Sequence, residues 1–223
     1  MARPWTILAT HDLDDARLEL RQRGDTDFLI LIDGRVLMNS FSRSSEEALS
    51  RLGLAHLAGT PAPKVLVGGL GMAFTLRAAL DVLPPVADVV VAELNAVIVE
   101  WCKGPLGPAT DHAVADPRVR LEMGDVADLI AKTPPGQFDA ILLDLYEGPN
   151  DASQGINDPF YSAAALARQH RAVAPGGVLA VWSEDRDERY EQRVVAAGFR
   201  LTTHAIGSGG RKHIVYLCAR SGG

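Results

Sequence analysis

From residue 64 onward the chain alternates short apolar runs with helix-like stretches, and this alternation restricts its fold more than any other feature. A stretch with helical spacing of apolar residues follows each of the first five runs. Strands that are apolar on both faces belong to a parallel sheet with helices on both sides. The sequence therefore predicts an α/β fold with a doubly wound, seven-stranded, mostly parallel sheet. Its predicted strands, the last two of them an antiparallel pair, lie at 65–69, 88–94, 118–123, 138–145, 178–183, 199–207 and 211–220.

The first forty residues follow a different pattern, which indicates a small antiparallel unit. Residues 16–24 alternate apolar and polar side chains, as a half-buried strand does. Asp33-Gly34 lies between two apolar runs within 27–40, and this pair supplies the positive φ angles of a two-residue hairpin turn. We therefore expect an antiparallel β appendage over about 5–40.

A helix is expected between the appendage and the first core strand. Ser44 followed by Glu47 fits a capping box at the start of this helix, and Gly59 is placed to end it. We accordingly divide the chain into an N-terminal β appendage over 1–42 and a main domain over 43–223.

Composition and charge argue against several classes of protein. The chain is 47% hydrophobic and 22% charged, which is typical of a globular protein with a sizeable core. Its formal net charge is −6, and no basic patch with interleaved aromatic residues is present, so we expect no nucleic-acid partner. No apolar run reaches the length of a membrane span, and acids near the start replace the apolar stretch of a secretion signal.

The cysteines and histidines suggest neither a disulfide framework nor a metal site. Cys102 and Cys218 are far apart in the sequence, which favours reduced thiols and a cytoplasmic location. The six histidines show no metal-ligand spacing with cysteines or acids, so we expect no metal. His204 and His213 are expected to face each other across the final antiparallel pair, in a structural role.

Gly69 and Gly71 directly follow the first core strand, where ligands of such sheets bind. Ligands lie outside the carboxyl ends of the parallel strands, and glycines there allow a tight turn and close approach to the backbone. A turn without any ligand is the alternative interpretation, because a single Gly-x-Gly is a weak signal.

Acids end the next three core strands, and this spacing strengthens the case for a nucleoside. Glu93 could accept hydrogen bonds from both hydroxyls of a ribose, or could be a solvated acid at a strand end. Asp125 could accept from an adenine amino group, could cap the following helix, or could do both. Asp144 ends the fourth strand.

The loop chemistry favours a nucleoside without phosphates. A dinucleotide site would place a third glycine where Phe74 stands, and no phosphate-binding lysine follows the loop. S-adenosylmethionine is the common ligand of this kind, and its positive sulfonium suits a site lined by acids.

Five segments of the sequence resemble the core of the spermidine synthase-like branch of the class I S-adenosylmethionine-dependent transferases. They are residues 65–80, 89–101, 116–130, 138–149 and 160–184. The resemblance covers residues 64–184 and, more loosely, the hairpin at 28–40. It implies the class I methyltransferase-like Rossmann fold, with Gly69 and Gly71 against the nucleoside, Glu93 on the ribose and Asp125 on the adenine. The full set that we expect to bind S-adenosylmethionine, or its decarboxylated form, is Gly69, Leu70, Gly71, Glu93, Leu94, Asp125, Val126 and Asp144.

The chain also departs from that family's pattern. The first loop lacks the acid that in spermidine synthases holds the amino group of decarboxylated S-adenosylmethionine. The usual Asp-Ser-Ser-Asp-Pro is replaced by residues 144–148, and the polyamine-binding Tyr-His-Glu segment is replaced by residues 44–53. These departures weaken the polyamine interpretation.

The candidate catalytic residues follow the fourth core strand. By resemblance Asp144 faces the reacting centre and takes a proton from the acceptor, with Glu147 as a second acid and Tyr146 stacking on or bonding the acceptor. Glu147 could equally be an exposed loop acid, and Tyr146 could pack the loop. Tyr161 and Trp182 are expected near the same rim, with core packing the favoured role of Trp182.

Three functions remain open from the sequence. The favoured one is methyl transfer from S-adenosylmethionine to a small-molecule acceptor. The alternatives are aminopropyl transfer from decarboxylated S-adenosylmethionine to a diamine, and nucleoside binding without turnover. We also expect a homodimer, formed through the edge of the N-terminal hairpin.

Overall fold

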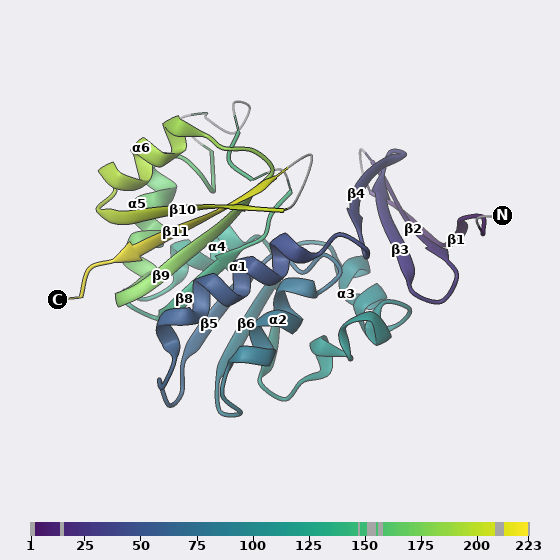
Figure 1. Ribbon diagram of the computed structural model, residues 1–223, viewed down its shortest axis with the longest axis horizontal. Helices are drawn as coiled ribbons and strands as arrows, with labels where there is room; N and C mark the ends of the chain where they lie inside the picture. The colour runs from purple at the N-terminus through teal and green to yellow at the C-terminus, as the bar shows by residue number, and fades with distance from the viewer. Residues whose placement is uncertain are drawn as a thin grey trace.

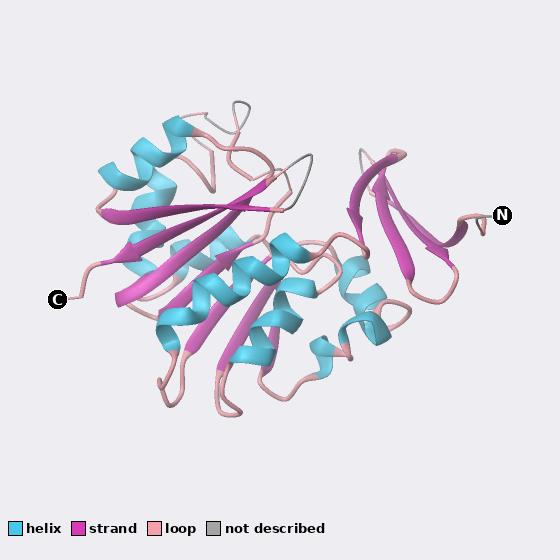
Figure 2. Ribbon diagram, in the orientation of Figure 1, coloured by secondary structure: helices cyan, strands magenta, loops and turns pink. Residues whose placement is uncertain are grey.

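The computed structural model describes residues 3–13, 16–146, 148–150, 155, 158–207 and 212–222. Two sheets organise this part of the chain, a seven-stranded sheet with helices on both faces and a four-stranded sheet built from the N-terminal residues (Figure 1). Figure 2 shows the layered α/β unit and the all-strand unit beside it. Both sheets were predicted from the sequence, and the predicted fold class is confirmed.

The main sheet has the strand order β10-β11-β9-β8-β5-β6-β7. Strands β5 to β9 pair in parallel, while β10 and β11 form an antiparallel pair that joins the sheet at β9. The chain direction across the sheet reverses between β5 and β8, and such a switch point leaves a crevice for ligands. The strand bounds are β5 (Lys64–Gly68), β6 (Asp88–Glu93), β7 (Val119–Met123), β8 (Phe138–Leu143), β9 (Val173–Ser183), β10 (Phe199–Ile206) and β11 (His213–Arg220).

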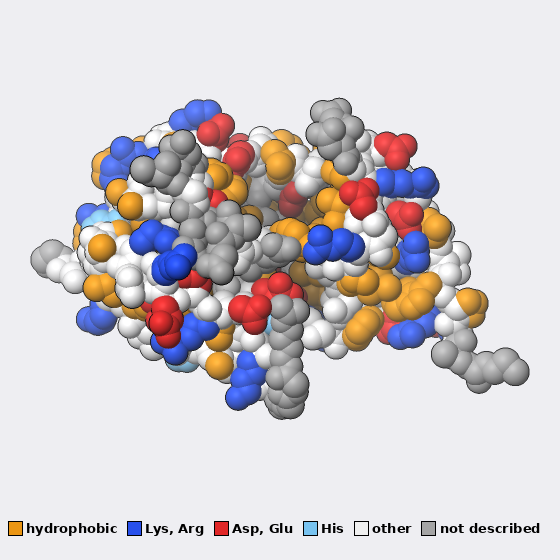
Figure 3. All heavy atoms as spheres, turned by 90° about the horizontal axis from the view of Figure 1, so that it is seen from above, with side chains coloured by type: hydrophobic (Ala, Val, Ile, Leu, Met, Phe, Trp, Pro, Cys, Tyr) orange, Lys and Arg blue, Asp and Glu red, His pale blue; other side chains and the backbone are white. Residues whose placement is uncertain are grey.

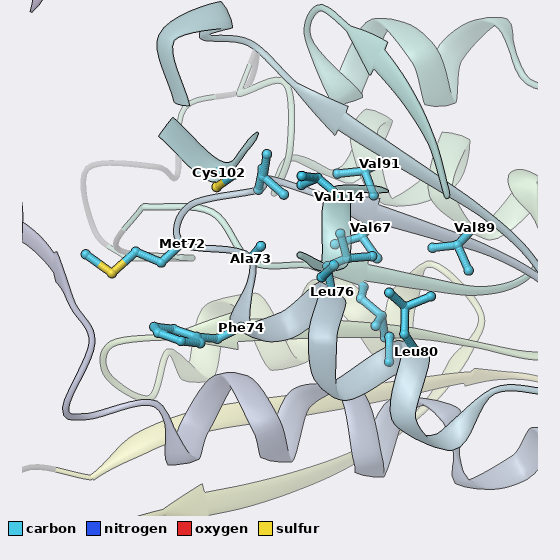
Figure 4. Close-up of a cluster of buried hydrophobic side chains, with 14 of the residues drawn as sticks. Val67, Met72, Ala73, Phe74, Leu76, Leu80, Val89, Val91, Cys102 and Val114 are labelled. Atoms are coloured by element: carbon cyan, nitrogen blue, oxygen red, sulfur yellow. The ribbon is translucent and has the colours of Figure 1, made fainter. Parts of the chain in front are cut away.

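Three α-helices of the described chain cover each face of the main sheet, because alternate residues of the strands are apolar toward opposite faces. Val65 and Val67 belong to the core under one set of helices, whereas Leu66 between them belongs to the other core. Figure 4 shows part of the first core, where side chains of β5, β6 and α2 meet. The helices of the first face are α1 (Ser44–Leu54), α2 (Phe74–Val82) and α3 (Ala96–Lys103), and those of the second are α4 (Val126–Lys132), α5 (Ala163–Ala172) and α6 (Glu188–Ala196).

Short 3-10 helices and side-chain caps complete the connections. The 3-10 helices are η1 (Ala55–Leu57), η2 (Gly107–Thr110) and η3 (Ala113–Ala115). Asp125, Ser162 and Asp187 cap α4, α5 and α6 by accepting backbone N–H hydrogen bonds. Within the described residues, no helix is both long enough and apolar enough to cross a membrane.

The N-terminal sheet is an antiparallel meander with strand order β1-β2-β3-β4. Its strands are β1 (Thr6–Asp12), β2 (Arg17–Arg23), β3 (Asp27–Ile32) and β4 (Arg35–Asn39). Leu18, Leu20, Phe28 and Ile30 are buried and belong to the same apolar cluster as the α1–α3 face of the main sheet. The meander is therefore packed on the main sheet's helical layer, and its last strand leads into α1.

The structure corrects three local predictions. Ser44 is the first residue of α1 and makes no capping hydrogen bond, and Glu47 forms an ion pair with Arg43 at 3.1 Å, so the capping box is wrong. Strand β9 begins at Val173 and includes the Pro-Gly-Gly segment, at an irregularity in its pairing with β8. His204 pairs with Val215 rather than lying opposite His213.

Candidate functional site

A cavity of about 610 Å³ opens at the carboxyl ends of the parallel strands, and strand β4 of the N-terminal sheet forms its other wall. Figure 3 looks down on the hollow between the two sheets and shows acidic side chains at its walls. Gly68 is in register with Leu143 on one side and with Ala92 on the other, so the residues after these strands share one edge. The volume is in the range of small-molecule sites.

Most of the residues predicted to bind a ligand lie around this one cavity. The structure places there Gly69, Gly71, Glu93, Leu94, Asp125, Val126, Asp144 and Tyr146. Leu70 differs, because its side chain is buried in the core and only its backbone N–H reaches the site, through Glu93. Glu147 lies outside the described residues.

Gly69 is required by the protein's own packing. Its φ is +88°, and a Cβ at this position would lie 2.4 Å from the carbonyl oxygen of Asp144. The backbone N–H of Asp144 in turn donates to the carbonyl of Gly68 at 2.9 Å. The turn after β5 therefore lies directly against the end of β8, where only a glycine fits.

Gly71 faces a flexible side chain instead of backbone. A Cβ there would lie 2.9 Å from Sδ of Met38, a β4 residue whose thioether also accepts the Met72 N–H at 3.2 Å. Met38 also lines the cavity, so a side chain that can change rotamer lies between the glycine loop and this part of the cavity.

Glu93 is buried at the end of β6 and already holds two backbone groups. Its Oε2 accepts the N–H of Leu70 at 2.9 Å, and its Oε1 accepts the N–H of Asn95 at 2.8 Å. A carboxylate offers about four acceptor positions, so capacity for two hydroxyl donors remains. Glu93 is therefore suited to a ribose, in addition to fixing the glycine loop.

Asp125 performs the helix-capping role that was one of its two predicted roles. Its Oδ1 accepts the N–H of Ala127 at 2.7 Å, and its side chain also faces the cavity. Val126 is buried and packs against Gly68. A Cβ at position 68 would lie 2.9 Å from Cγ2 of Val126. Leu94 is 67% exposed at the cavity mouth. These residues would enclose a planar ring between apolar side chains and an acceptor.

Asp144 has an altered proton affinity. Its pKa is raised from 3.8 to about 7, mainly by burial and in addition by the negative charge of Glu46. A hydrogen bond from the Thr75 hydroxyl to Oδ2 acts in the opposite direction. A carboxyl group with a pKa near neutrality can accept a proton and release it again at physiological pH.

Glu46 is a site residue that sequence reasoning missed. It lies in the first turn of α1, is only 7% exposed, and lines the cavity. The Ser45 hydroxyl donates to its Oε2 at 2.6 Å, and Nδ1 of His213 lies 3.0 Å from the same hydroxyl oxygen. The pattern of residues 44–47 also fits a helix cap, and the partner on β11 is 168 positions away, so no local signal identified the pair.

Aromatic side chains form the end of the cavity near Asp144. Tyr146 is half exposed, and its hydroxyl accepts a hydrogen bond from Arg35 at 3.1 Å. The Tyr161 hydroxyl and the Trp182 Nε1 are buried and have no hydrogen-bond partner among the described residues. Burial and the charges of Asp158 and Asp144 raise the pKa of Tyr161, so its hydroxyl remains a donor. Two polar groups at the wall therefore have unused hydrogen-bonding capacity.

Gly148 and Pro149, in the loop after β8, lie against the end of β9. Gly148 has a φ of +67°, and a Cβ there would lie 2.4 Å from the carbonyl oxygen of Trp182. The Ser183 hydroxyl lies 3.2 Å from the Pro149 carbonyl oxygen and 2.6 Å from that of Asp185, and its one proton can be donated to either. The loop that carries Tyr146 is thereby fixed to the end of β9. Among the described residues, no group of three potential ligands could hold a metal ion.

Comparison with known proteins gives both sequence relatives and structural neighbours. No family model matches the chain. It is 29% identical over 158 residues to a spermine synthase of Arabidopsis thaliana, covering 70% of this chain and 41% of the relative. It is 32% identical over 129 residues to putrescine N-methyltransferase 3 of Nicotiana tabacum, covering 57% of this chain and 32% of the relative.

The structural comparison decides the fold. The crystal structure of spermidine synthase from Thermotoga maritima matches 96% of this chain and 73% of its own, with a TM-score of 0.76 and 18% identity. The chain has the spermidine synthase fold. The resemblance predicted from the sequence, to the spermidine synthase-like branch of the class I transferases, is confirmed. The chain spans about a third to a half of the length of these curated relatives.

Proposed function

We propose that this chain is an S-adenosylmethionine-dependent methyltransferase that acts on a small amine. The observation that carries the proposal is the convergence of Glu93, Asp125 and Asp144 on one cavity, beside a glycine loop that carries no acid. Putrescine N-methyltransferases among the relatives support an amine acceptor and a methyl group as cargo.

The residues at the strand ends fit a nucleoside donor. Glu93 keeps two acceptor positions for ribose hydroxyls, and Asp125 keeps acceptor capacity beside its capping bond. Val126 and Leu94 would lie against the base, and Gly69 and Gly71 would leave room beside the loop. The donor supplies an activated methyl on a positive sulfur, so displacement at carbon needs mainly proximity and orientation, worth up to about 7–11 kcal/mol.

The acceptor end of the cavity provides the proton chemistry. An amine must lose its ammonium proton before its lone pair can attack, and we assign the acceptance of that proton to Asp144. Thr75 fixes the orientation of the Asp144 carboxyl group, and Tyr161 offers an unused hydroxyl donor. With a pKa of about 7, Asp144 is ionised and able to accept a proton above neutrality, so turnover should rise with pH through about 7.

Aminopropyl transfer is the second candidate. The spermine and spermidine synthases among the relatives favour it, as does the acidic acceptor end formed by Asp144 and Glu46. Against it stands the glycine loop, where Met38 lies over Gly71 and no acid is present to hold the donor's amino group. Arg35 at the cavity wall suits the carboxylate that only intact S-adenosylmethionine carries.

Titration calorimetry with the two donors tests the proposal. We expect S-adenosylmethionine to bind more tightly than its decarboxylated form, and mass spectrometry to detect an amine product heavier by one methyl group. Preference for the decarboxylated donor, with an aminopropyl product, would establish the second candidate. Binding of a nucleoside with no product from a panel of amines would favour the non-catalytic alternative.

Three further predictions accompany this proposal. The division at residue 42, a cytoplasmic location and a homodimer remain expectations from the sequence. β1 is an edge strand that is largely exposed, so it offers a surface for pairing with a second copy. Light scattering after size-exclusion chromatography measures the oligomeric state directly.

A further inference from the structure

Glu46 is a buried acid that has no role in the methyl transfer proposed above. It lies in the first turn of α1, where the positive end of the helix dipole stabilises a negative side chain. Its neighbour Glu47 points elsewhere and pairs with Arg43 and Arg51 at 3.1 and 3.7 Å. Burying a charged side chain is costly unless partners compensate, so the placement of Glu46 in the cavity wall needs an explanation.

The hydrogen bonds around Glu46 define where the protons lie. A serine hydroxyl carries one proton, and Ser45 donates it to Oε2 of Glu46 at 2.6 Å. The contact of 3.0 Å between Nδ1 of His213 and the Ser45 oxygen therefore requires that the ring nitrogen carries a hydrogen. The ring of His213 is in turn held edge-on against Trp182, with centroids 5.0 Å apart. The resulting chain of donors ends on the Glu46 carboxylate.

Asp144 and Glu46 reach the same cavity from opposite elements. Asp144 follows β8 and is held by Thr75 of α2, while Glu46 is held by residues of α1 and β11. Ser50, one helical turn after Glu46, donates to the Thr75 carbonyl at 2.7 Å, so the helix that carries Glu46 packs against the residue that holds Asp144. Among the described residues, the other titratable or charged side chains that line this cavity are Arg35 of β4, Glu93 at the end of β6, Asp125 after β7, Tyr146 after β8, Tyr161 before α5, Glu184 after β9 and His213 of β11.

We propose that Glu46 is a positioning residue for Asp144 at the acceptor end of the cavity, and that Ser45 and His213 keep Glu46 in the cavity wall. A negative charge near a buried carboxyl group favours its protonated form, so Glu46 increases the proton affinity of Asp144. Asp144 is the carboxyl group that gains and loses the proton.

The assignment rests on the proposed function for its chemical purpose. An acceptor ammonium gives its proton to the Asp144 carboxylate, and the freed nitrogen lone pair forms the new N–C bond. The C–S bond breaks, and its electron pair goes to the sulfur, which becomes neutral. The proton then leaves Asp144 to solvent. Glu46 acts through Asp144 in this scheme, because its fixed negative charge increases the proton affinity of the base.

The direct test is the titration of Asp144 in the protein without any donor or acceptor. Carbon-13 NMR of labelled aspartate carboxyl groups follows it in the wild type, in Glu46→Gln and in the matched control Glu47→Gln. We expect Glu46→Gln to lower the midpoint by about one pH unit or more, and Glu47→Gln to leave it unchanged. An unchanged midpoint in Glu46→Gln would overturn the proposed role of Glu46.

A second variant keeps the test decisive if Glu46→Gln does not fold. Ser45→Ala removes the hydrogen bond that holds Glu46 in the cavity wall, so the midpoint of Asp144 should move in the same direction as in Glu46→Gln. An unchanged midpoint in Ser45→Ala would also overturn the proposed role of Glu46. Calorimetry with S-adenosylmethionine separates the two proposals: without donor binding, a shifted titration would leave the role of Glu46 standing and refute only the methyltransferase.

Discussion

Replacing Asp144 with Asn should stabilise the protein, and the gain should grow as the pH rises. The folded protein holds the pKa of Asp144 at about 7, whereas the ordinary value is 3.8. Between these values the unfolded chain releases a proton that the folded chain retains, so wild-type stability falls with rising pH. Asn cannot ionise and still accepts a hydrogen bond from Thr75, so the variant does not have this loss.

The size of the effect follows from the same two values. A pKa increase from 3.8 to about 7 corresponds to about 4 kcal/mol of unfavourable charging, at 1.36 kcal/mol per pH unit. Asp144 opens partly onto the cavity, so solvent should reduce the observable gain to about 2 kcal/mol. The gain should be near its minimum at pH 4, increase through pH 5 and 6, and level off above pH 7.

Urea unfolding at a series of pH values measures the effect. The free energy of unfolding of Asp144→Asn minus that of the wild type cancels the titration of all groups whose environment is unchanged. A difference that does not vary between pH 4 and 8 would refute the argument, because it would mean that Asp144 titrates normally in the folded chain. A difference that falls with pH would show that the folded site favours the charged carboxylate.

Three further outcomes follow from the site. Gly69→Ala should lower the free energy of unfolding in urea by about 3 kcal/mol or more, because the new Cβ would clash with the backbone. Gly59 also has a positive φ but faces open space, so Gly59→Ala should lower that free energy by only about 1–2 kcal/mol. Equal losses in the two variants would contradict this argument. Glu93→Gln should weaken S-adenosylmethionine binding about tenfold or more in calorimetry, with the exposed Glu100→Gln as control; unchanged affinity would remove Glu93 from the site. Burial raises the pKa of Cys102 to about 12. A disulfide reagent at pH 8 should therefore label the thiol of the folded protein about a thousandfold more slowly than the thiol of the urea-unfolded protein. Comparable labelling rates would show that the thiol is not buried.

The fold was predictable because its signals are local and repeated. Five apolar runs, each followed by a helical pattern, specify a parallel sheet without knowledge of any contact. Asp33-Gly34 likewise indicated the β3–β4 hairpin, and both residues have the positive φ that such a turn requires. The element ends were less certain, as the early start of β9 at Val173 illustrates, because pairing with β8 continues through the glycines.

Part of the candidate site was predictable for the same reason. In a parallel sheet the residues that follow the strands meet at one edge, so Glu93, Asp125 and Asp144 could be placed together from their spacing alone. Glu46 could not be found in this way, because its burial depends on how α1 packs and its partner His213 is on the last strand. Met38 was missed for a similar reason, since the position of β4 over the glycine loop is a tertiary contact.

The glycines of the first loop show how one pattern can have two causes. The sequence suggested that a ligand excludes side chains from Gly69 and Gly71. In the structure the carbonyl of Asp144 excludes a side chain at Gly69, and Met38 lies against Gly71. The glycines therefore bring β5 and β8 together, and by doing so they place Asp144 beside the loop.

Binding of S-adenosylmethionine, measured by titration calorimetry on the wild type and on Glu93→Gln, tests the central claim most directly. The account predicts saturable binding of one donor per chain, weakened about tenfold or more in the variant. No binding of S-adenosylmethionine or its decarboxylated form, or tight binding of a phosphate-bearing dinucleotide in its place, would contradict it.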